Sequence, residues 1–483
     1  MTEREYEIVI GLEVHAQLLT RTKAFCGCST AFGNEPNTQV CPICLGMPGV
    51  LPVYNKKALE FAILTGLALN CQIAEFCKFD RKNYFYPDLP KGYQISQYDK
   101  PIGKNGYIEI NLDGNIKKIG INRVHMEEDA GKLLHSSDSF QHAEGSFVDL
   151  NRSGVPLLEI VTEPDIRSKD EAKEYLTKLR TILMYIGVCD GNMEEGSLRC
   201  DANISIRPRG SNKLGTKTEI KNVNSFKFIQ KALDYEAERQ INCLRNNELI
   251  IQETRLWDTE RNMTISMRSK EEAHDYRYFP EPDLVPIHVS LDWIEEVKNN
   301  LPELPDKKCG RFVEQYKIPF YDAQILTSEK PLALYFEKCV SLYNEPKIIS
   351  NWIMGEVLRV LKENNLDITN FLVTPDILTD LLKLIDKGII SSKIAKIVFE
   401  EAVNTGKNPE KIIEEKGLNQ ISDETLIKEI VKKTVENNPK SVEDYKNGKE
   451  KAIGFLVGQV MKETKGKANP AMVNKLLQEA LKL

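Results

Sequence analysis

The sequence predicts an α+β fold, in which a strand-rich N-terminal region is followed by an all-α helical region and a small α-helical tail. Residues 1–293 contain short alternating segments separated by Gly, Pro and Asn, which is typical of strands and turns. After Trp293 the apolar residues recur with helical periodicity, and two prolines in residues 301–306 favour a connector. The length of 483 residues corresponds to three domains at about 100–200 residues each. We place these domains at 1–293, 294–408 and 409–483.

Two strands of the N-terminal region can be located by their alternation. Residues 8–15 place Glu13 and His15 on one face and Ile10 and Leu12 on the other. Residues 197–207 alternate more strictly. Their apolar face is formed by Leu198, Cys200, Ala202, Ile204 and Ile206, and their polar face by Ser197, Arg199, Asp201, Asn203, Ser205 and Arg207. A strand with so many polar side chains on one face is either solvated or lines a site.

The C-terminal half contains amphipathic helical segments, among them residues 376–385 and 393–402. The tail has a further apolar stripe at helical spacing, formed by Ile453, Leu456, Val457, Val460 and Met461. Gly454 and Gly458 lie on an adjacent face, where another helix or a ligand could approach closely. Pro470 is placed to begin the next helix.

Composition and charge are those of a globular protein, with 41% hydrophobic and 28% charged residues. The net charge of −6 argues against a protein that coats nucleic acid through bulk charge. Residues 440–483 nevertheless carry nine lysines against five acidic residues, hence +4, which leaves −10 for the other 439 residues. The charged N-terminus resembles neither a secretion signal nor a transit peptide, and no apolar segment is long enough to span a membrane. Eleven cysteines without an export signal therefore indicate a reducing cytoplasm.

Four cysteines form the sharpest motif. Cys26 and Cys28 are separated by one residue, and Cys41 and Cys44 follow after a loop, at the spacing of a second close pair. Two such pairs can surround one Zn²⁺ tetrahedrally and leave no open coordination position, so we expect a structural zinc site. The alternatives are two unrelated reduced pairs or a redox pair.

The second motif is the carboxylate and imidazole of Glu13 and His15 on one strand face. This pair is an incomplete metal shell, and further acids are available in residues 127–129, at Asp201 and at Glu219. Such a carboxylate-rich set suits Mg²⁺ or Mn²⁺ holding phosphates. The alternative is an ordinary solvated strand face.

Residues 80–97 form a third motif, dense in cationic, aromatic and acidic groups and stiffened by two prolines. Lys82 and Lys91 in this segment could contact a phosphate or a carboxylate of a ligand, although a tyrosine-rich surface loop is the alternative. The sequence contains no GxxxxGK[ST], GxGxxG or HExxH motif. Any nucleotide is therefore bound outside the common phosphate-loop architectures.

The motifs together closely resemble the GatB family, the B subunits of the tRNA-dependent amidotransferases. The similarity runs nearly from end to end and includes the four cysteines. The shared strings are IGLEVH (10–15), CLGMPG (44–49), DRKNYFYPDLPK (80–91), HMEEDAGK (125–132), NRSGVPLLEIV (151–161), EEGSLRCD (194–201), EIKNVNSF (219–226), VGQVM (457–461) and TKGKANP (464–470).

The resemblance implies a heterotrimeric, cytoplasmic ligase whose other two members are an amidase, the A subunit, and a small protein, the C subunit. Such an enzyme uses ATP and Mg²⁺ to phosphorylate the side-chain carboxylate of mischarged Glu-tRNA(Gln) or Asp-tRNA(Asn). Ammonia released from glutamine by the amidase then displaces phosphate. The resemblance also implies that residues 1–293 form a cradle-shaped catalytic domain and that the helical and tail domains bind tRNA.

Site residues follow from the same resemblance. Glu13, His15, Glu128 and Glu219 fall on the family's metal-site motifs, and Asp201 is added partly because it lies on the polar strand face. Glu128, Lys82 and Lys91 are the expected catalytic residues. The two lysines match positions beside the family's ammonia path, where they could relay or gate ammonia. The sequence assigns no residue that contacts ATP.

Two rival interpretations exist. The archaeal-type counterpart, which acts on Glu-tRNA(Gln), would carry an additional inserted domain, which this length does not favour. A non-catalytic, zinc-containing tRNA-binding scaffold would lack the acids at Glu13, Glu128 and Glu219, which are present. The sequence does not indicate which of the two mischarged tRNAs is the substrate.

Overall fold

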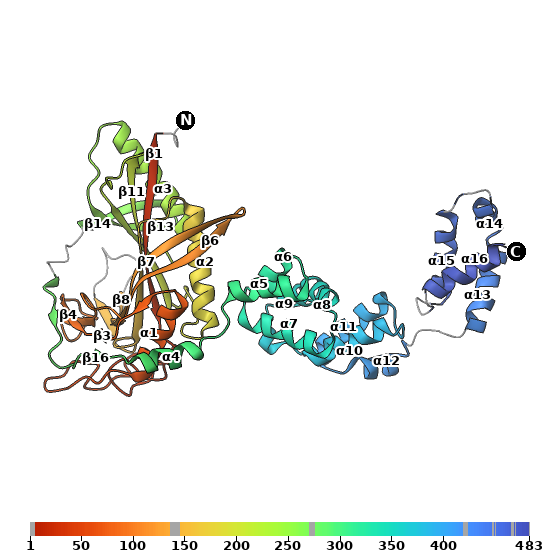
Figure 1. The fold of residues 1–483 in the computed structure, drawn as a ribbon, viewed down its shortest axis with the longest axis horizontal. Helices are drawn as coiled ribbons and strands as arrows, with labels where there is room; N and C mark the ends of the chain where they lie inside the picture. The colour runs from red at the N-terminus through yellow and green to blue at the C-terminus, as the bar shows by residue number, and fades with distance from the viewer. Residues whose placement is uncertain are drawn as a thin grey trace. The chain divides into compact units, whose positions relative to one another are not determined.

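The structure is a computed structural model that describes residues 5–135, 145–269, 276–418, 424–446, 449, 451–464, 468 and 470–482. The chain divides into two compact units, an N-terminal unit of residues 1–305 and a C-terminal unit of residues 306–483 (Figure 1). Large strands dominate the N-terminal unit and helices the C-terminal unit. This composition confirms the predicted α+β class.

A sheet of twelve strands, counted over the described residues, forms the centre of the N-terminal unit. Ten strands run in the order β14-β13-β12-β11-β1-β10-β7-β5-β4-β15, and β6 pairs with β7 and β2 off this path. The strands are β1 (Tyr6–Gln17), β2 (Gln72–Ile73), β4 (Asp80–Asn83), β5 (Tyr93–Ser96), β6 (Gly103–Leu112), β7 (Asn115–Glu128), β10 (Pro156–Thr162), β11 (Leu198–Pro208), β12 (Thr218–Lys221), β13 (Glu253–Asp258), β14 (Met263–Ser269) and β15 (Phe279–Pro280). Two small ribbons pair β3 (Phe76–Cys77) with β16 (Ile287–His288) and β8 (Lys132–His135) with β9 (Ser146–Asp149).

Alternation along the central strands separates a buried face from a polar one. The five apolar side chains predicted to share a face of residues 197–207 are all buried in β11. In β1, Leu12 and Val14 are buried, and Glu13 and His15 project from the opposite face. Both strand predictions are confirmed.

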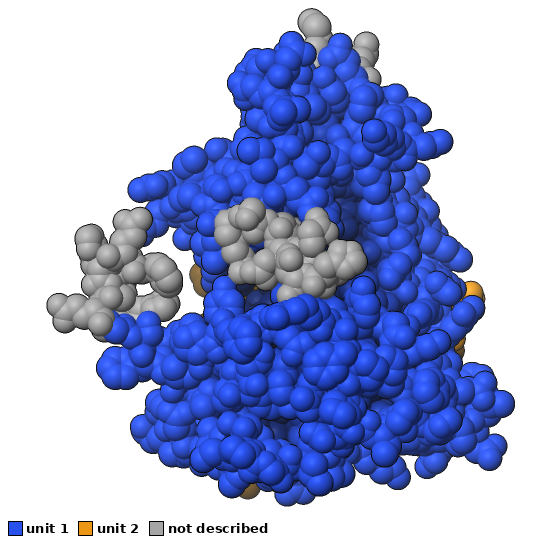
Figure 2. Space-filling view, turned by 90° about the vertical axis from the view of Figure 1, so that its left-hand side faces the viewer, with its two compact units in different colours: residues 1–305 blue, residues 306–483 orange. Residues whose placement is uncertain are grey.

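Within the described part of this unit, four helices accompany the sheet: α1 (Lys56–Ala68), α2 (Lys169–Tyr185), α3 (Phe226–Arg245) and α4 (Leu291–Asn299). Side chains of Asn55, Ser168, Ser225 and Ser290 cap their first turns. Helix α2 packs on β6 and α3, and α3 packs on β11, so the apolar sides of the strands and helices form one core. The polar sides of β1, β10, β11 and β7 are left to line a site. Seen from the side, the surface of the N-terminal unit is hollowed near its middle (Figure 2).

The C-terminal unit is helical throughout its described residues and contains two separate apolar clusters. One cluster extends from Cys309 to Ile413 and the other from Ile427 to Leu481. The helices are α5 (Pro305–Tyr316), α6 (Phe320–Leu326), α7 (Lys330–Leu342), α8 (Pro346–Trp352), α9 (Leu358–Asn364), α10 (Pro375–Asp386), α11 (Ser392–Thr405), α12 (Pro409–Lys416), α13 (Glu424–Asn437), α14 (Pro439–Lys446), α15 (Lys451–Glu463) and α16 (Pro470–Lys482), with a π-helical turn at Ile353–Val357 and a 3₁₀ turn at Ile368–Asn370.

Helices α10 and α11 contain the two predicted amphipathic segments, and α15 carries the predicted stripe with Leu456 and Val460 buried. Pro470 begins α16 as expected. Among the described residues, no atom outside the neighbouring residues and the backbone of the same helix lies within 4 Å of a Cβ position built on Gly454 or Gly458. Neither glycine therefore supports a close helix contact in this structure. No helix in the described ranges combines the length and the apolar character that crossing a membrane requires.

Candidate functional site

The polar face of the sheet borders a cavity of about 590 Å³ in the N-terminal unit. Its charged lining consists of Glu13, His15, Lys82, Arg123, His125, Glu127, Glu159, Asp201, Lys217, Glu219 and Lys221. Four of the five predicted magnesium ligands are in this set, as is Lys82.

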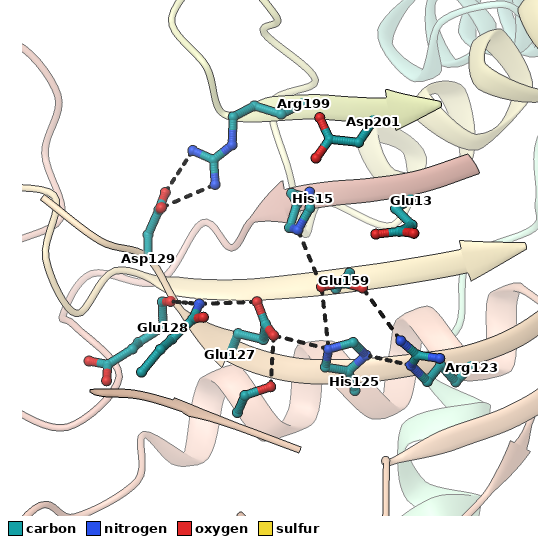
Figure 3. A network of polar contacts seen from close by, with 12 residues as sticks. Glu13, His15, Arg123, His125, Glu127, Glu128, Asp129, Glu159, Arg199 and Asp201 are labelled. Atoms are coloured by element: carbon teal, nitrogen blue, oxygen red, sulfur yellow. Dashed lines mark hydrogen bonds and ion pairs between the residues drawn. The ribbon is translucent and has the colours of Figure 1, made fainter. Parts of the chain in front are cut away.

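Strand register brings these side chains together. His15 of β1 lies opposite Arg199 of β11 on one side and opposite Glu159 of β10 on the other. Glu159 in turn lies opposite His125 of β7. Four neighbouring antiparallel strands thus each present a polar residue in one row, as Figure 3 shows. Side chains in such a row are close because neighbouring strands lie about 5 Å apart.

Two side chains of this row and Glu127 beside it could hold a metal ion. One ligand atom from each of His15, Glu127 and Glu159 lies within 4.8 Å of the other two. His15 Nε2 is 3.3 Å from Glu159 Oε2, and His125 Nε2 is 3.1 Å from Glu127 Oε1 and 3.5 Å from Glu159 Oε2. Ser96 donates a further hydrogen bond of 2.7 Å to Glu127 Oε1. Two carboxylates and one imidazole are a donor set that suits a hard divalent cation.

The electrostatics of the row favour carboxylates in the charged form. Burial would raise the pKa of Glu159, but His125 and His15 hold that pKa well below its ordinary value. Burial would likewise lower the pKa of His125, but Glu159 and Glu127 outweigh burial and raise that pKa to about 9. The two imidazoles thus hold the Glu159 carboxylate in its charged form. Because metal ligands must be deprotonated, a charged carboxylate at this place suits a divalent cation.

The other predicted ligands gather beside this row on the same face. Glu219 accepts a hydrogen bond of 2.8 Å from Thr254 Oγ1. Lys221 Nζ lies 2.5 Å from Asp201 Oδ2 and 3.7 Å from Glu219 Oε1. Glu13 accepts a hydrogen bond of 2.7 Å from the Asn203 amide.

Glu128 is not among these groups, although it was expected there. Its side chain projects from the opposite face of β7, because it follows the parity of the buried Met126, whereas Glu127 follows that of His125. Glu128 accepts a hydrogen bond from Lys91 Nζ and another of 3.0 Å from the backbone N–H of Ile95. Figure 3 shows Glu127 directed towards His125 and Glu128 directed away from it. Glu127, and not Glu128, therefore lies on the polar face beside His125.

The two predicted lysines are placed on different sides of the sheet. Lys82 of β4 lines the acid-lined cavity, with its Nζ 4.9 Å from the centre of the Tyr276 ring. Burial would lower the pKa of Lys82, but nearby acidic groups, foremost Glu127 and also Glu159, together outweigh burial and raise that pKa. Lys91 instead lines a second cavity of about 200 Å³ together with Glu128, Cys26 and Cys44.

The four predicted zinc ligands are brought together. Their sulfur atoms lie within 4.8 Å of one another, and each cysteine is in the reduced form. The hydrogen bond from Cys26 lowers the pKa of Cys44 to about 4 despite the opposing effect of burial, which favours the thiolate that binds metal. Lys23, only 1% exposed, places its Nζ 3.7 Å from Cys44 Sγ. The donor set of four sulfur atoms fits a structural Zn²⁺.

Sequence reasoning gave no role to His125 or Glu159. Glu159 is a single charged residue within the apolar run of β10, and such a residue on a central strand is a signal for a site. His125 is two residues before Glu127, so both belong to one strand face. Their proximity to His15 depends on the register between strands β1, β10 and β7.

Comparison with known proteins gives matches over nearly the whole chain. Residues 8–295 match the family model described as GatB/GatE catalytic domain, and residues 334–481 match the one described as GatB domain. The B subunit of aspartyl/glutamyl-tRNA(Asn/Gln) amidotransferase from Caldanaerobacter subterraneus subsp. tengcongensis is 62% identical over 477 residues, which cover 99% of each chain. Its counterpart from Thermodesulfovibrio yellowstonii is 62% identical over 478 residues, covering 99% of this chain and 100% of the relative. The chain therefore belongs to GatB, the family of amidotransferase B subunits.

Proposed function

We propose that this chain activates and amidates the side-chain carboxylate of mischarged Glu-tRNA(Gln), Asp-tRNA(Asn) or both, using ATP. The observation that carries the proposal is the cluster of two carboxylates and two imidazoles presented by β1, β7 and β10, in one cavity with the ammonium groups of Lys82 and Lys221. The names of the relatives, which are B subunits of aspartyl/glutamyl-tRNA(Asn/Gln) amidotransferases, support the choice of substrate.

The chemistry requires activation because a carboxylate is a poor electrophile. A carboxylate oxygen attacks the γ-phosphorus of ATP, which forms an acyl phosphate and releases ADP. Ammonia then attacks the acyl carbon, phosphate leaves with the bonding electron pair, and the nitrogen loses a proton to give the amide. Positioning and charge stabilisation account for most of the catalysis in phosphoryl transfer.

The residues of the cavity suit these tasks. His15, Glu127 and Glu159 would hold Mg²⁺, with Glu13, Asp201 and Glu219 as further ligands on the same face. Bound Mg²⁺ supplies charge neutralisation across the phosphates of ATP. Lys82 and Lys221 are fixed cations that would bind the transferred phosphoryl group or the substrate carboxylate.

We further propose that ammonia comes from an amidase partner, with a small third protein in the complex, as the lettered designation of the relatives suggests. Lys91 and Glu128 would relay or gate ammonia from the second cavity. Their buried ion pair supports this role, because a buried charged pair holds a defined geometry.

The C-terminal unit would bind the body of the tRNA. Residues 440–483 carry +4, and basic residues contact phosphates without regard to sequence. We retain the three domains at 1–293, 294–408 and 409–483 as a proposal. Three separate apolar clusters support it, although the second cluster extends to Ile413, beyond the proposed boundary.

The neighbouring residues Glu127 and Glu128 provide a matched experiment. Glu127→Gln and Glu128→Gln each remove one charge from adjacent positions whose side chains project from opposite faces. Each variant is purified with its partner proteins and assayed on both mischarged tRNAs, with and without ATP, using either glutamine or free ammonium as the nitrogen donor.

Glu127→Gln is expected to abolish ATP-dependent phosphorylation with both nitrogen donors. Glu128→Gln is expected to keep phosphorylation but to lose amide formation from glutamine, with partial recovery in free ammonium. Amide formation without any nucleotide would refute the mechanism. Full activity of Glu127→Gln would refute the assigned metal site.

A further inference from the structure

Two tyrosines form a parallel stack at the acid-lined cavity. The ring centres of Tyr98 and Tyr278 are 4.2 Å apart, and their planes differ by 10°. Both side chains line the cavity that contains Glu127 and Lys82. Tyr98 remains 52% exposed although Tyr278 covers one face of its ring. With one ring face against Tyr278, the opposite face is the one on which a ligand could stack.

Hydrogen bonds fix the backbone at Tyr98. The N–H of Tyr98 donates a hydrogen bond of 3.0 Å to Asp80 Oδ2, and Lys78 Nζ lies 2.6 Å from Asp80 Oδ1. The side chain of the preceding residue, Gln97, accepts hydrogen bonds of 3.1 Å from the backbone N–H groups of Ile102 and Met126. These contacts tie the Tyr98 backbone to β4 and β7. The ring is thus preorganised, which reduces the entropy lost when a ligand stacks on it.

The cavity consequently combines a flat aromatic surface with a charged interior. A ligand that fits both would carry a planar base on one side and phosphates or a carboxylate on the other. Aromatic side chains bind bases in this way because every base has a π face. Under the proposed function, two substrates have this chemistry. The 3′-terminal adenosine of an aminoacyl-tRNA carries the amino acid on its ribose, and ATP carries its phosphates on the ribose of an adenine nucleoside.

We propose that the face of the Tyr98 ring opposite Tyr278 is a stacking platform for an adenine ring, belonging either to the 3′ end of the tRNA or to ATP. This inference rests on the proposed function, because that function brings an adenine to the cavity. Removal of one base-stacking ring weakens binding by about 5- to 150-fold.

The test uses the full chain in complex with its partner proteins. Tyr98→Ala removes the ring and Tyr98→Phe keeps it. Phe147→Ala is the control, since Phe147 is an aromatic residue of β9 that is 70% exposed and does not line this cavity. Dissociation constants are measured for ATP, for an acceptor-stem minihelix ending in CCA, and for the same minihelix without its terminal adenosine.

Tyr98→Ala is expected to weaken one adenine-bearing probe by about 5- to 150-fold, while Tyr98→Phe and Phe147→Ala bind it like the unmodified complex. A loss confined to the CCA minihelix identifies the tRNA 3′ end, and a loss confined to ATP identifies the nucleotide. Unchanged binding of both probes would overturn the proposal. If the two minihelices, with and without the terminal adenosine, lose the same affinity and ATP binding is unchanged, the proposal is also overturned.

Tyr98→Trp gives an independent measurement should Tyr98→Ala fold poorly. Stacking of an adenine on the indole should quench its fluorescence when the CCA minihelix or ATP is added, relative to the complex without this substitution. Absence of any added quenching at saturation would contradict the platform. Failure of the proposed function is distinguishable, because the unmodified complex would then form no amide from either mischarged tRNA.

Discussion

Lys23 provides a quantitative test of the cysteine cluster as a zinc site. Its Nζ lies 3.7 Å from Cys44 Sγ and 3.2 Å from the carbonyl oxygen of Leu150. A Zn²⁺ ion with four thiolates carries a net charge of −2, or about half a negative charge for each sulfur. Lys23 would therefore be a buried cation that offsets part of this charge. Lys23→Met removes the cation and keeps a side chain of similar length.

The distance sets the expected magnitude. Two unit charges separated by 3.7 Å interact by about 4 kcal/mol at an effective dielectric constant near 20, so half a charge on the sulfur gives about 2 kcal/mol. This energy corresponds to a loss of about 30-fold in zinc affinity, within the 10- to 100-fold range typical of residues that contact metal ligands.

Zinc affinity is measured by competition with a chromogenic chelator, and the thiolate-to-metal absorption of the Co²⁺-substituted protein reports the geometry of the site. Lys57→Met is the control, because Lys57 is an exposed lysine that pairs with Glu60 on α1. An unchanged zinc affinity in a folded Lys23→Met protein would refute the reasoning. An equal loss in Lys57→Met would attribute the effect to net charge alone.

Three further predictions concern packing, acid stability and tRNA binding. Gly46→Ala would place a methyl group 2.5 Å from Lys91 Cγ at a φ of +65°, so thermal or urea unfolding should show a destabilisation of about 1–3 kcal/mol. Burial would raise the pKa of Asp129, but Arg199 helps to lower it, so the stability from this pair is present above pH about 4 and is lost as the pH falls through the lowered value. Asp129→Asn should cost about 3 kcal/mol at pH 7 and weaken that acid dependence, which urea titrations at pH 7 and at about pH 2 would measure. Deletion of residues 419–483 removes the last apolar cluster and should reduce tRNA affinity and its salt dependence in filter-binding assays, whereas unchanged affinity would contradict the proposed role of the tail.

Strand periodicity and cysteine spacing predicted much of the architecture. The alternation in β1 and β11 could be read directly, because burial of one sheet face imposes a period of two on the sequence. The cysteine cluster could be read because its two pairs are each local in sequence. The helices α10 and α11 were predictable from their apolar stripes, because each stripe lies within a single helix.

The contacts among His15, His125 and Glu159 depend on the register between strands, which the residues within any one strand do not determine. Glu159 meets His15 and His125 only because β10 lies between β1 and β7 in one alignment. Which of Glu127 and Glu128 lies on the polar face, in contrast, can be predicted from the sequence. His125 and Glu127 share a strand parity, and Glu128 shares that of Met126, so alternation alone assigns Glu127 to the polar face.

The separation of the two candidate metal centres affects how chelation experiments on this enzyme are to be read. The sulfur cluster lines the same cavity as the Lys91–Glu128 pair, whereas the carboxylate row belongs to the cavity on the polar face. A chelator strong enough to strip thiolate-bound zinc would therefore alter both cavities. Mg²⁺ added back afterwards would restore only the carboxylate side. Any measurement of magnesium dependence consequently needs the zinc content of the same sample, before and after treatment.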